Sequence, residues 1–392
     1  MRALSVLVGA ATRTGGPPAF VGGAAVELGK LGADVRVLAT DLALAPWGLA
    51  QRQRRIVPDE VHPSLAAADL RLFPARFPRR LAFSPALRAE LRRTAPEFDL
   101  IHIHNLWQYP QYAAYRAAGR EGVRYVVSPH GALDPYLRRH GRGRKLAMDV
   151  LWQREMLEGA ALIHVTTEAE RDLIADVAPE VPRAVVPCGI YVEEFAEPPP
   201  AERFRVRLGG YEGPLVVFLG RITRKKGVDV LIRAFARARR ELDCRLAIVG
   251  PDDEGILPGL RGLAAELGVG DEVEFVGPAY GDDRLAALAS ADVWALSSHT
   301  ENFGIAVVEA MAAGCAVAIS PGVNISADVA EAGAGVVVDA TPDAFGDALA
   351  ALLADDRRRA DLQGEARRFA ARYDWSVVAT RLLDAYRRAA TT

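Results

Sequence analysis

Short apolar runs alternate with longer amphipathic segments along most of this 392-residue chain. This alternation predicts strands and helices in turn, which is typical of parallel α/β folds. The runs are continuously apolar, as expected of strands that are covered on both faces. In the first half, strands are predicted at residues 3–9, 34–40, 99–105, 125–129, 161–166 and 183–187, with a helix at 19–31.

The pattern breaks at three consecutive prolines, Pro198, Pro199 and Pro200, and then starts again. Proline stiffens a chain and cannot join a central strand, so we interpret this segment as an interdomain linker. Beyond it, strands are predicted at 215–219, 245–249, 272–276, 293–296, 316–320 and 335–338, with helices at 228–239, 257–267, 284–289, 305–312 and 342–353. The sequence therefore predicts an α/β protein of two doubly wound domains, residues 1–197 and 201–375, with a helical tail at 362–373 and 376–389.

The composition is that of an ordinary globular protein, with 50% hydrophobic and 25% charged residues. A net charge of −2 argues against nucleic acid as a partner. The apolar run near the N-terminus is too short for a signal peptide, and no apolar stretch reaches the roughly 18 residues of a membrane span. Three scattered cysteines without CxxC spacing indicate reduced thiols. We therefore expect a cytoplasmic protein.

A basic loop, Gly220–Gly227, directly follows the first predicted strand of the second domain. The chain has only four lysines, in an arginine-rich background typical of GC-rich bacterial genomes, and two of them are Lys225 and Lys226. Arg221 as a planar fork and Lys226 as a point charge could neutralise a diphosphate. A solvated basic turn is the alternative. The GxxxxGK[ST] order of a P-loop is absent.

Two glutamates eight residues apart flank the start of the helix predicted at 305–312. Glu301 stands in the loop before the helix, with Asn302, Phe303 and Gly304, and Glu309 lies within it. A helix N-terminus favours anions, so acids beside it suggest a ligand that carries hydroxyls as well as phosphates, such as a sugar nucleotide. The alternatives are a helix-capping role for Glu301 and a structural ion pair for Glu309.

The first domain offers weaker signals. Gly15 and Gly16 follow its first strand, where they could admit a ligand or form a plain tight turn. The lack of GxGxxG there disfavours a nicotinamide cofactor. His130 follows another strand and is expected to face a cleft between the two predicted domains. His102 and His104 lie within a strand, and we interpret them as structural because a third metal ligand at sensible spacing is missing.

In this order and spacing, the four segments resemble the retaining glycosyltransferases of the GT-B fold, glycosyltransferase family four. The resemblance covers the chain from about residue 9 to about 320. It implies two Rossmann-like domains that face each other across a cleft, with a final helix, residues 376–392, that packs back on the first domain. It also implies that neither a cofactor nor a metal is needed, because fixed cations hold the donor.

The resemblance further assigns a role to each candidate residue. Arg221 and Lys226 would hold the donor diphosphate, Glu301 would contact the sugar hydroxyls, and His130 would face the transferred sugar. The main chain of Asn302, Phe303 and Gly304 would support Glu301 at the sugar. Glu309 would bind the ribose, and the Gly15–Gly16 turn would admit a phosphate.

The implied activity is that of a hexosyltransferase, which moves a sugar from a nucleotide-diphosphate sugar to a glycan or lipid-linked acceptor. Segments 105–107 and 321–325 resemble enzymes of exopolysaccharide and lipopolysaccharide synthesis, which points to cell-surface polysaccharide. The alternatives are a nucleotide-sugar epimerase of the same architecture and a non-catalytic, two-lobed sugar-binding protein. The pairing of the basic loop with the two glutamates disfavours the epimerase.

Basic residues also gather in the first domain. Residues 52–93 contain ten arginines against four acids, interleaved with Phe73, Phe77 and Phe83, and residues 116–145 are basic too. If both stretches share a face, they could hold the protein peripherally on the anionic inner face of a membrane, at about 1 kcal/mol per basic residue. An ordinary solvated surface is an equally good interpretation.

Overall fold

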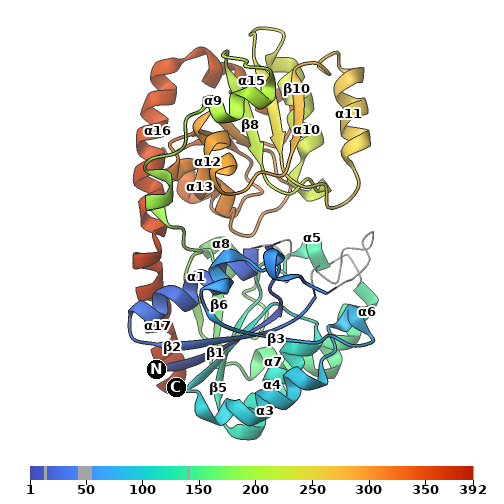
Figure 1. Ribbon diagram of the computed structural model, residues 1–392, viewed down its shortest axis with the longest axis vertical. Coiled ribbons are helices and arrows are strands. Elements are labelled where there is room, and N and C mark those ends of the chain that lie inside the picture. The colour runs from blue at the N-terminus through green and yellow to red at the C-terminus, as the bar shows by residue number, and fades with distance from the viewer. Residues whose placement is uncertain (13–15, 43–54, 139–141, 392) are drawn as a thin grey trace. The chain divides into compact units, whose positions relative to one another are not determined.

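The computed structural model describes residues 1–12, 16–42, 55–138 and 142–391. The chain forms two compact units. The first comprises Met1–Gly189 together with Trp375–Thr392, and the second comprises Ile190–Asp374. In Figure 1 the first unit runs from blue to green and ends in red, whereas the second runs from green to orange-red.

A seven-stranded parallel sheet of order β3-β2-β1-β4-β5-β6-β7 forms the core of the first unit. Six of its strands lie within two residues of the predicted bounds at each end. The sequence missed β3, because its polar and apolar residues alternate and this edge strand is half exposed. The strands are β1 (Arg2–Gly9), β2 (Asp34–Thr40), β3 (Asp69–Phe73), β4 (Leu100–His104), β5 (Arg124–Ser128), β6 (Leu162–Val165) and β7 (Arg183–Val185).

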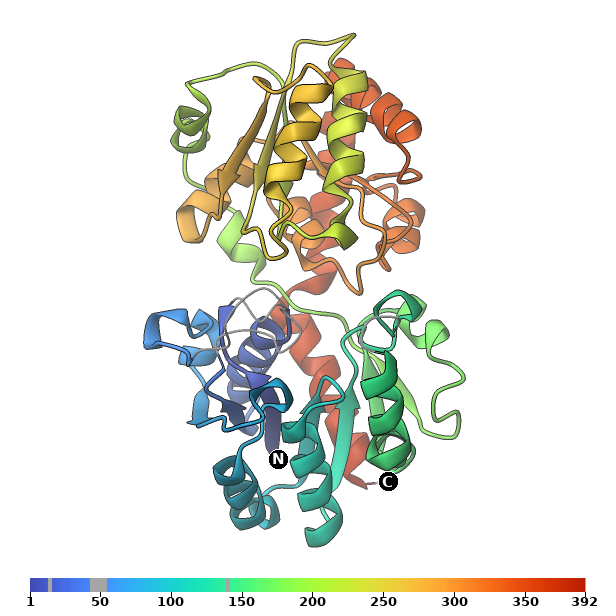
Figure 2. The same cartoon turned by 90° about the vertical axis from the view of Figure 1, so that its right-hand side faces the viewer.

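Helices cover this sheet on both faces (Figures 1 and 2). On one face α3 and α4 pack against each other, and on the other face α1 packs on the C-terminal helix α17. The helices are α1 (Gly16–Lys30), α2 (Pro63–Ala66), α3 (Pro85–Thr94), α4 (Tyr109–Glu121), α5 (Pro135–Arg138), α6 (Arg142–Met148), α7 (Arg154–Glu158), α8 (Glu168–Leu173) and α17 (Trp375–Thr391), and a π-helix, η5 (Asp149–Gln153), joins α6 to α7.

The second unit has a six-stranded parallel sheet of order β10-β9-β8-β11-β12-β13. Its strands are β8 (Leu215–Leu219), β9 (Arg245–Val249), β10 (Val273–Gly277), β11 (Val293–Leu296), β12 (Ala316–Ile319) and β13 (Val336–Val337). Its α-helices are α9 (Glu202–Arg205), α10 (Val228–Ala238), α11 (Leu257–Glu266), α12 (Gly281–Ala289), α13 (Ile305–Ala312), α14 (Ser326–Glu331), α15 (Pro342–Ala354) and α16 (Asp356–Ala370). Both units are thus doubly wound α/β layers, as predicted.

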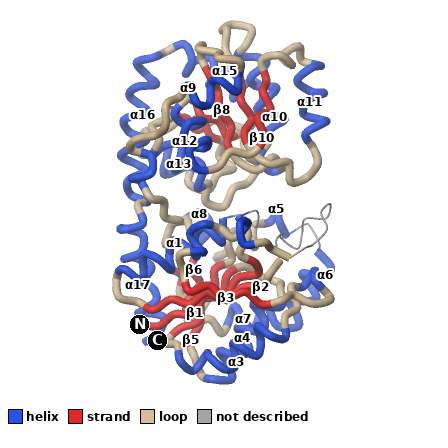
Figure 3. The backbone as a smooth tube through the Cα atoms, viewed as in Figure 1, coloured by secondary structure: helices blue, strands red, loops and turns tan. Residues whose placement is uncertain are grey.

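The strand order reverses direction beside the first strand of each sheet, between β1 and β4 and between β8 and β11. Figure 3 shows the strands of both sheets in red. In open α/β sheets, ligands bind beyond the carboxyl ends of the strands at such a point. The basic loop follows β8, and the loop that carries Glu301 follows β11. The fold therefore places these two segments next to each other.

The boundary between the units lies at Gly189 and Ile190, eight residues before the predicted proline linker began. The intervening 3₁₀ turn, η6 (Val192–Phe195), belongs to the second unit. Its Phe195 side chain is buried, which anchors the segment there. Where the chain returns, the Ile190 N–H donates to the Tyr373 carbonyl at 2.9 Å, so the two crossings lie side by side.

Among the described residues, no helix is both long and apolar enough to cross a membrane. The same part of the chain contains no group of three His, Cys, Asp or Glu residues that could hold a metal ion. Its three cysteines are free thiols, and Cys244 and Cys315 are buried.

Candidate active site

In the second unit, hydrogen bonds join the basic loop to the loop after β11. The Ser298 hydroxyl donates to the Lys225 carbonyl at 2.9 Å, and the Ser297 hydroxyl donates to the Gly227 carbonyl at 2.7 Å. The His299 N–H also donates to the Lys225 carbonyl, at 2.8 Å. These bonds fix the turn η8 (Arg224–Lys226) directly against the acidic loop.

Gly227 makes this close approach possible. Its φ of 63° lies in the left-handed region, and a Cβ atom there would stand 2.1 Å from the Ser297 carbonyl oxygen. Any other residue would push the two loops apart. The glycine that ends the basic motif is thus required by packing.

The fixed loops bring Lys225, Lys226 and Glu301 into one largely buried cluster, with side chains 22%, 12% and 16% exposed. The Lys226 Nζ contacts the Glu301 Oε2, and the Lys225 Nζ lies 3.6 Å from the same oxygen. Burial alone would raise the pKa of the Glu301 carboxyl, but the two lysines outweigh burial and lower this pKa to about 2. Burial lowers the pKa of Lys226, although Glu301 opposes that shift. The cluster therefore concentrates positive charge at the carboxyl end of β8.

Arg221 lies at the open side of this cluster. Its Nη1 bonds the Asp253 Oδ2 at 3.1 Å, and its side chain keeps 39% of its exposure. A half-exposed guanidinium with one bonded nitrogen has donors left for an incoming anion. Asp253 was not singled out from the sequence, in which nothing distinguishes it from neighbouring acids.

The loop around Glu301 is held by the segment after β12. The Glu301 N–H donates to the Gly322 carbonyl at 2.8 Å, and the Asn324 N–H donates to the Glu301 carbonyl at 3.0 Å. Gly304 has a φ of 83°, which favours glycine at the start of α13. The Phe303 ring is buried against Tyr373, with centroids 5.5 Å apart, so this residue can offer a ligand only its main chain.

Glu309, the second glutamate, lies on α13 and is paired. Its Oε1 accepts a hydrogen bond from Arg284 Nη1 at 2.5 Å, and Arg284 Nη2 lies 3.2 Å from the Glu194 Oε2. Sequence reasoning missed Arg284, because one more arginine in an arginine-rich chain carries no signal. The ion pair was anticipated as the structural alternative for Glu309.

In the first unit, Gly15 lies outside the described residues, whereas Gly16 is the first residue of α1 and is exposed. Among the described residues other than its chain neighbours, no atom lies within 4 Å of the position that a Gly16 Cβ would take.

His130 follows β5 in the left-handed conformation, with a φ of 50°. Its Nε2 lies 3.0 Å from Nδ1 of His104, and the two rings stack with centroids 5.3 Å apart. Burial lowers the pKa of His130 to about 3, so its imidazole is neutral. The adjacent Gly131 N–H donates to the buried Glu170 carboxylate at 2.7 Å, a contact with no signal in the sequence.

His102 belongs to a chain of four neutral side chains. The Val186 carbonyl can only accept, so His164 donates to it through Nε2 at 2.7 Å and accepts from the Ser128 hydroxyl at 2.6 Å through Nδ1. Ser128 accepts in turn from the His102 Nε2 at 2.6 Å. The His102 Nδ1 accepts from the Tyr386 hydroxyl of α17 at 2.6 Å. His102 is thus structural, as predicted, whereas His104 contacts the candidate site residue His130.

Family comparisons divide the chain in the same way as the fold does. The family model described as "Glycosyl transferase 4-like domain" matches residues 15–189, and the one described as "Glycosyl transferases group 1" matches residues 202–369. A curated relative from Xylanimonas cellulosilytica, named "D-inositol 3-phosphate glycosyltransferase", is 34% identical over 322 residues, which cover 77% of this chain and 75% of the relative.

Solved structures agree with the fold. Anabaena Alr3699/HepE in complex with UDP and glucose has a TM-score of 0.76 at 18% identity, with 98% of this chain and 99% of that chain covered. WaaG, described as a glycosyltransferase involved in lipopolysaccharide biosynthesis, has a TM-score of 0.70 at 19% identity, with the same coverage. At these identities the likeness shows the GT-B fold alone.

Proposed function

The chain belongs to the group 1 glycosyl transferases of the GT-B fold, and on this premise we propose that its donor is a nucleotide-diphosphate sugar. The observation that carries the proposal is the largely buried cluster of Lys225, Lys226 and Glu301 at the carboxyl ends of β8 and β11. Incubation with UDP-, GDP- and ADP-sugars should give slow nucleotide release with one of them. A protein that binds but never releases free nucleotide would contradict the proposal.

Donor binding exchanges one set of ion pairs for another. The diphosphate competes with Glu301 for Lys226 and Lys225, while Arg221 adds a planar fork from the open side. Glu301, once released from the lysines, can accept hydrogen bonds from sugar hydroxyls. Glu309 binds the ribose, the main chain of Asn302, Phe303 and Gly304 supports the sugar, and His130 faces it.

The leaving group needs no metal in this scheme. Negative charge develops on the nucleotide diphosphate as the glycosidic bond breaks, and preorganised cations stabilise it most at that moment. EDTA treatment should therefore leave activity unchanged. Loss of activity that Mn²⁺ restores would contradict a metal-independent reaction.

The transfer keeps the anomeric configuration of the donor. Double displacement requires a carboxylate nucleophile behind the anomeric carbon, but Glu301 and Glu309 are both assigned to hydroxyls. The acceptor hydroxyl instead attacks from the face that the phosphate leaves, and its proton passes to the departing phosphate oxygen. Proton NMR of the first-formed product tests this proposal, since a β-linked product from an α-linked donor would overturn it.

The acceptor is a glycan or lipid-linked sugar, in synthesis of cell-surface polysaccharide. Likeness of segments 105–107 and 321–325 to enzymes of that class supports this assignment. The curated relative carries the name of D-inositol 3-phosphate, so that compound belongs in the same acceptor assay. Transfer to D-inositol 3-phosphate and to no lipid-linked glycan would contradict a polysaccharide role.

An apolar helix face in the first unit supports peripheral contact with an anionic membrane from the cytoplasm. Leu146, Val150 and Leu151 on α6 and η5 are 62%, 80% and 74% exposed. Basic residues flank them, including Arg142 and Lys145. A basic helix with apolar side chains outward is the pattern of an interfacial helix.

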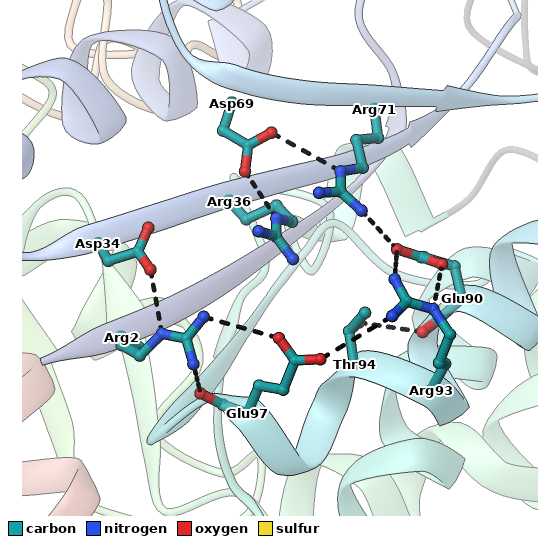
Figure 4. A network of polar contacts seen from close by, with 9 residues as sticks. All are labelled: Arg2, Asp34, Arg36, Asp69, Arg71, Glu90, Arg93, Thr94 and Glu97. Carbon is teal, nitrogen blue, oxygen red and sulfur yellow. Dashed lines mark hydrogen bonds and ion pairs between the residues drawn. The ribbon is translucent and has the colours of Figure 1, made fainter.

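Aromatic contacts link this face to the other basic stretch. The Trp152 ring of η5 contacts the Tyr112 ring, which contacts the Tyr109 ring. The Tyr109 and Phe83 rings follow, with centroids 4.6 Å apart. Not all the arginines are available, because Arg71 and Arg93 pair with acids in the network of Figure 4. The paired arginines occupy β3 and α3.

Sedimentation with vesicles tests the membrane proposal. Anionic phosphatidylglycerol vesicles should bind the wild type in a salt-sensitive way, and Val150→Ser with Leu151→Ser should abolish binding. Leu173→Ser serves as a control, because Leu173 is an exposed leucine on α8. Equal binding to neutral vesicles, or no binding at all, would contradict the proposal.

A further inference from the structure

Arg284 occupies an unusual position for an arginine in the second unit. It lies on the first turn of α12 and bonds two carboxylates, those of Glu309 on α13 and Glu194 on η6. Its guanidinium also lies over the Phe195 ring, 5.3 Å from the centroid. Two separate elements, α13 and η6, therefore hold this one side chain.

The charges explain why the arrangement is tight. The Glu309 carboxylate, followed by Glu194, raises the pKa of Arg284. Two acids around one cation leave a net negative charge, so removal of Arg284 would deprive both Glu309, which is largely buried, and Glu194, which is exposed, of their shared cation. Arg284 must therefore stay in place for the Glu309 carboxylate to keep its bonded partner.

The bond geometry leaves half of Glu309 unused. Arg284 takes Oε1, and within the part of the chain that the structure describes, no hydrogen bond to Oε2 exists. The guanidinium is planar and its Nη2 is bonded to Glu194, so the direction of its Nη1 bond to Glu309 is set, whereas one lysine ammonium could not bond both carboxylates in this way. Oε1 of Glu309 is thus anchored, while Oε2 is left for another donor.

We propose that Arg284 is a positioning residue for the donor: it holds Glu309 so that the second carboxylate oxygen accepts a hydrogen bond from a ribose hydroxyl. The inference rests on the proposed function, in which Glu309 binds the ribose. Arg284 itself touches neither the ribose nor the reacting atoms. Phe195 and Glu194 hold the guanidinium from its other side.

The test compares nucleotides that differ by one hydroxyl. UDP, GDP and ADP are titrated against the wild type by calorimetry, and the tightest binder is then compared with its 2′-deoxy and 3′-deoxy forms. The wild type should prefer the ribonucleotide to at least one deoxy form by about tenfold or more, as expected for one hydrogen bond to a charged group. Arg284→Gln should lower the ratio of the two affinities, ribonucleotide to deoxy form, to about one, and Glu309→Gln should do the same.

Two further variants separate positioning from general damage. In a double variant, Arg284→Gln should add little to the loss caused by Glu309→Gln, because both remove one interaction. Arg203→Gln is the matched control. Arg203 of α9 pairs at 2.7 Å with Asp283, which precedes Arg284 on α12, and it does not contact Glu309. This control should keep the full preference for the ribonucleotide.

Steady-state kinetics give the second readout. Arg284→Gln should raise KM for the donor by about tenfold with a smaller change in kcat, because the lost contact serves ground-state binding as well. If Arg284→Gln does not fold, Arg284→Lys carries the test, since one ammonium cannot bond Glu309 and Glu194 in the set directions of a planar guanidinium, and the preference should again fall.

The outcomes are distinct. A folded Arg284 variant that keeps the wild-type preference overturns the inference and leaves the proposed function intact. A wild type that binds a nucleotide without any preference for ribose overturns both the role of Glu309 and this inference. A wild type that binds none of the three nucleotides overturns the proposed function and the inference together.

Discussion

The two units bury polar groups in or beside the strands of their sheets in opposite ways. In the second unit, Lys225, Lys226 and Glu301 are largely buried as charges, and the one carboxylate pairs with both ammonium groups. In the first unit, His102 and His164 are buried without charge, joined through hydroxyls and ending on a backbone carbonyl. In both units the polar groups are paired, but only the cluster in the second unit holds a cation that an anionic ligand can bind.

The difference separates binding from architecture. A buried cation with a displaceable carboxylate is suited to binding a phosphate, because the exchange preserves charge balance. A neutral chain of hydrogen bonds has a fixed donor and acceptor at every step, so it specifies one arrangement of its strands and helix. We therefore expect acid and mutation to affect the two clusters differently.

Acid should give the largest contrast. The pKa values of His130 and His164 lie at about 3 and about 4, below the ordinary value of 6.5, so the stability that these neutral rings give is complete above pH 6.5 and is lost as the pH falls. Glu301, with a pKa of about 2 against an ordinary 4.5, loses its contribution only below pH 4.5.

Between pH 6.5 and 4.5 the first unit should therefore lose stability before the donor cluster does. Hydrogen exchange at several pH values, corrected for intrinsic rates, measures this unit by unit. Earlier opening of peptides from β8 and β11 than of those from β4 and β5 would contradict the comparison.

Lys226→Ala should have the next largest effect. Removal of a preorganised cation from the leaving group should cut turnover by about a hundredfold or more, with the fold intact. Lys30→Ala is the control, because Lys30 is an exposed lysine that pairs with Glu27 in the first unit. An unchanged rate in folded Lys226→Ala would remove this residue from the mechanism.

Tyr386→Phe tests the neutral chain. The substitution deprives the His102 Nδ1 of its donor in a buried site and should lower the free energy of unfolding by about 1–3 kcal/mol. Urea unfolding measures the loss, and Tyr112→Phe controls for removal of a hydroxyl from a less buried tyrosine. Equal stability of both variants would show that the chain contributes nothing.

The surface network of Figure 4 should give the smallest effect. Glu90 binds both Arg71 and Arg93 there, at 2.8 Å each. Because exposed ion pairs are screened, Glu90→Gln should lower the free energy of unfolding by at most about 1 kcal/mol, and less at high salt. Unfolding at low and high ionic strength measures this, and a salt-independent loss of several kcal/mol would contradict it.

Strands with continuous apolar runs were predictable, because burial on both faces requires an apolar residue at nearly every position. The edge strand β3 was not, since half of its residues face solvent. The domain boundary was also missed, because the anchor at Phe195 is a tertiary contact, whereas the prolines marked only a local stiffness.

In the candidate site, too, local patterns were predictable and tertiary contacts were not. Glycine and charge in short motifs identified Gly227, Lys226 and Glu301, whose approach the strand order then explained. Partners from distant segments carried no local pattern. Arg284 lies 25 residues from Glu309 along the chain, and the contact of His104 with His130 spans 26. Such pairs become visible only when the sheet brings them together.

The tail helix α17 has a consequence for synthesis on the ribosome. The second unit is continuous from Ile190 to Asp374, whereas the first needs Trp375–Thr391. Trp375 fills the space beside both Gly23 and Gly189, where a Cβ would stand 2.4 and 2.3 Å from its ring. Domains generally fold as the nascent chain emerges. Here the unit that is translated first must remain incomplete until the last helix leaves the exit tunnel, so the second unit can finish folding before the first.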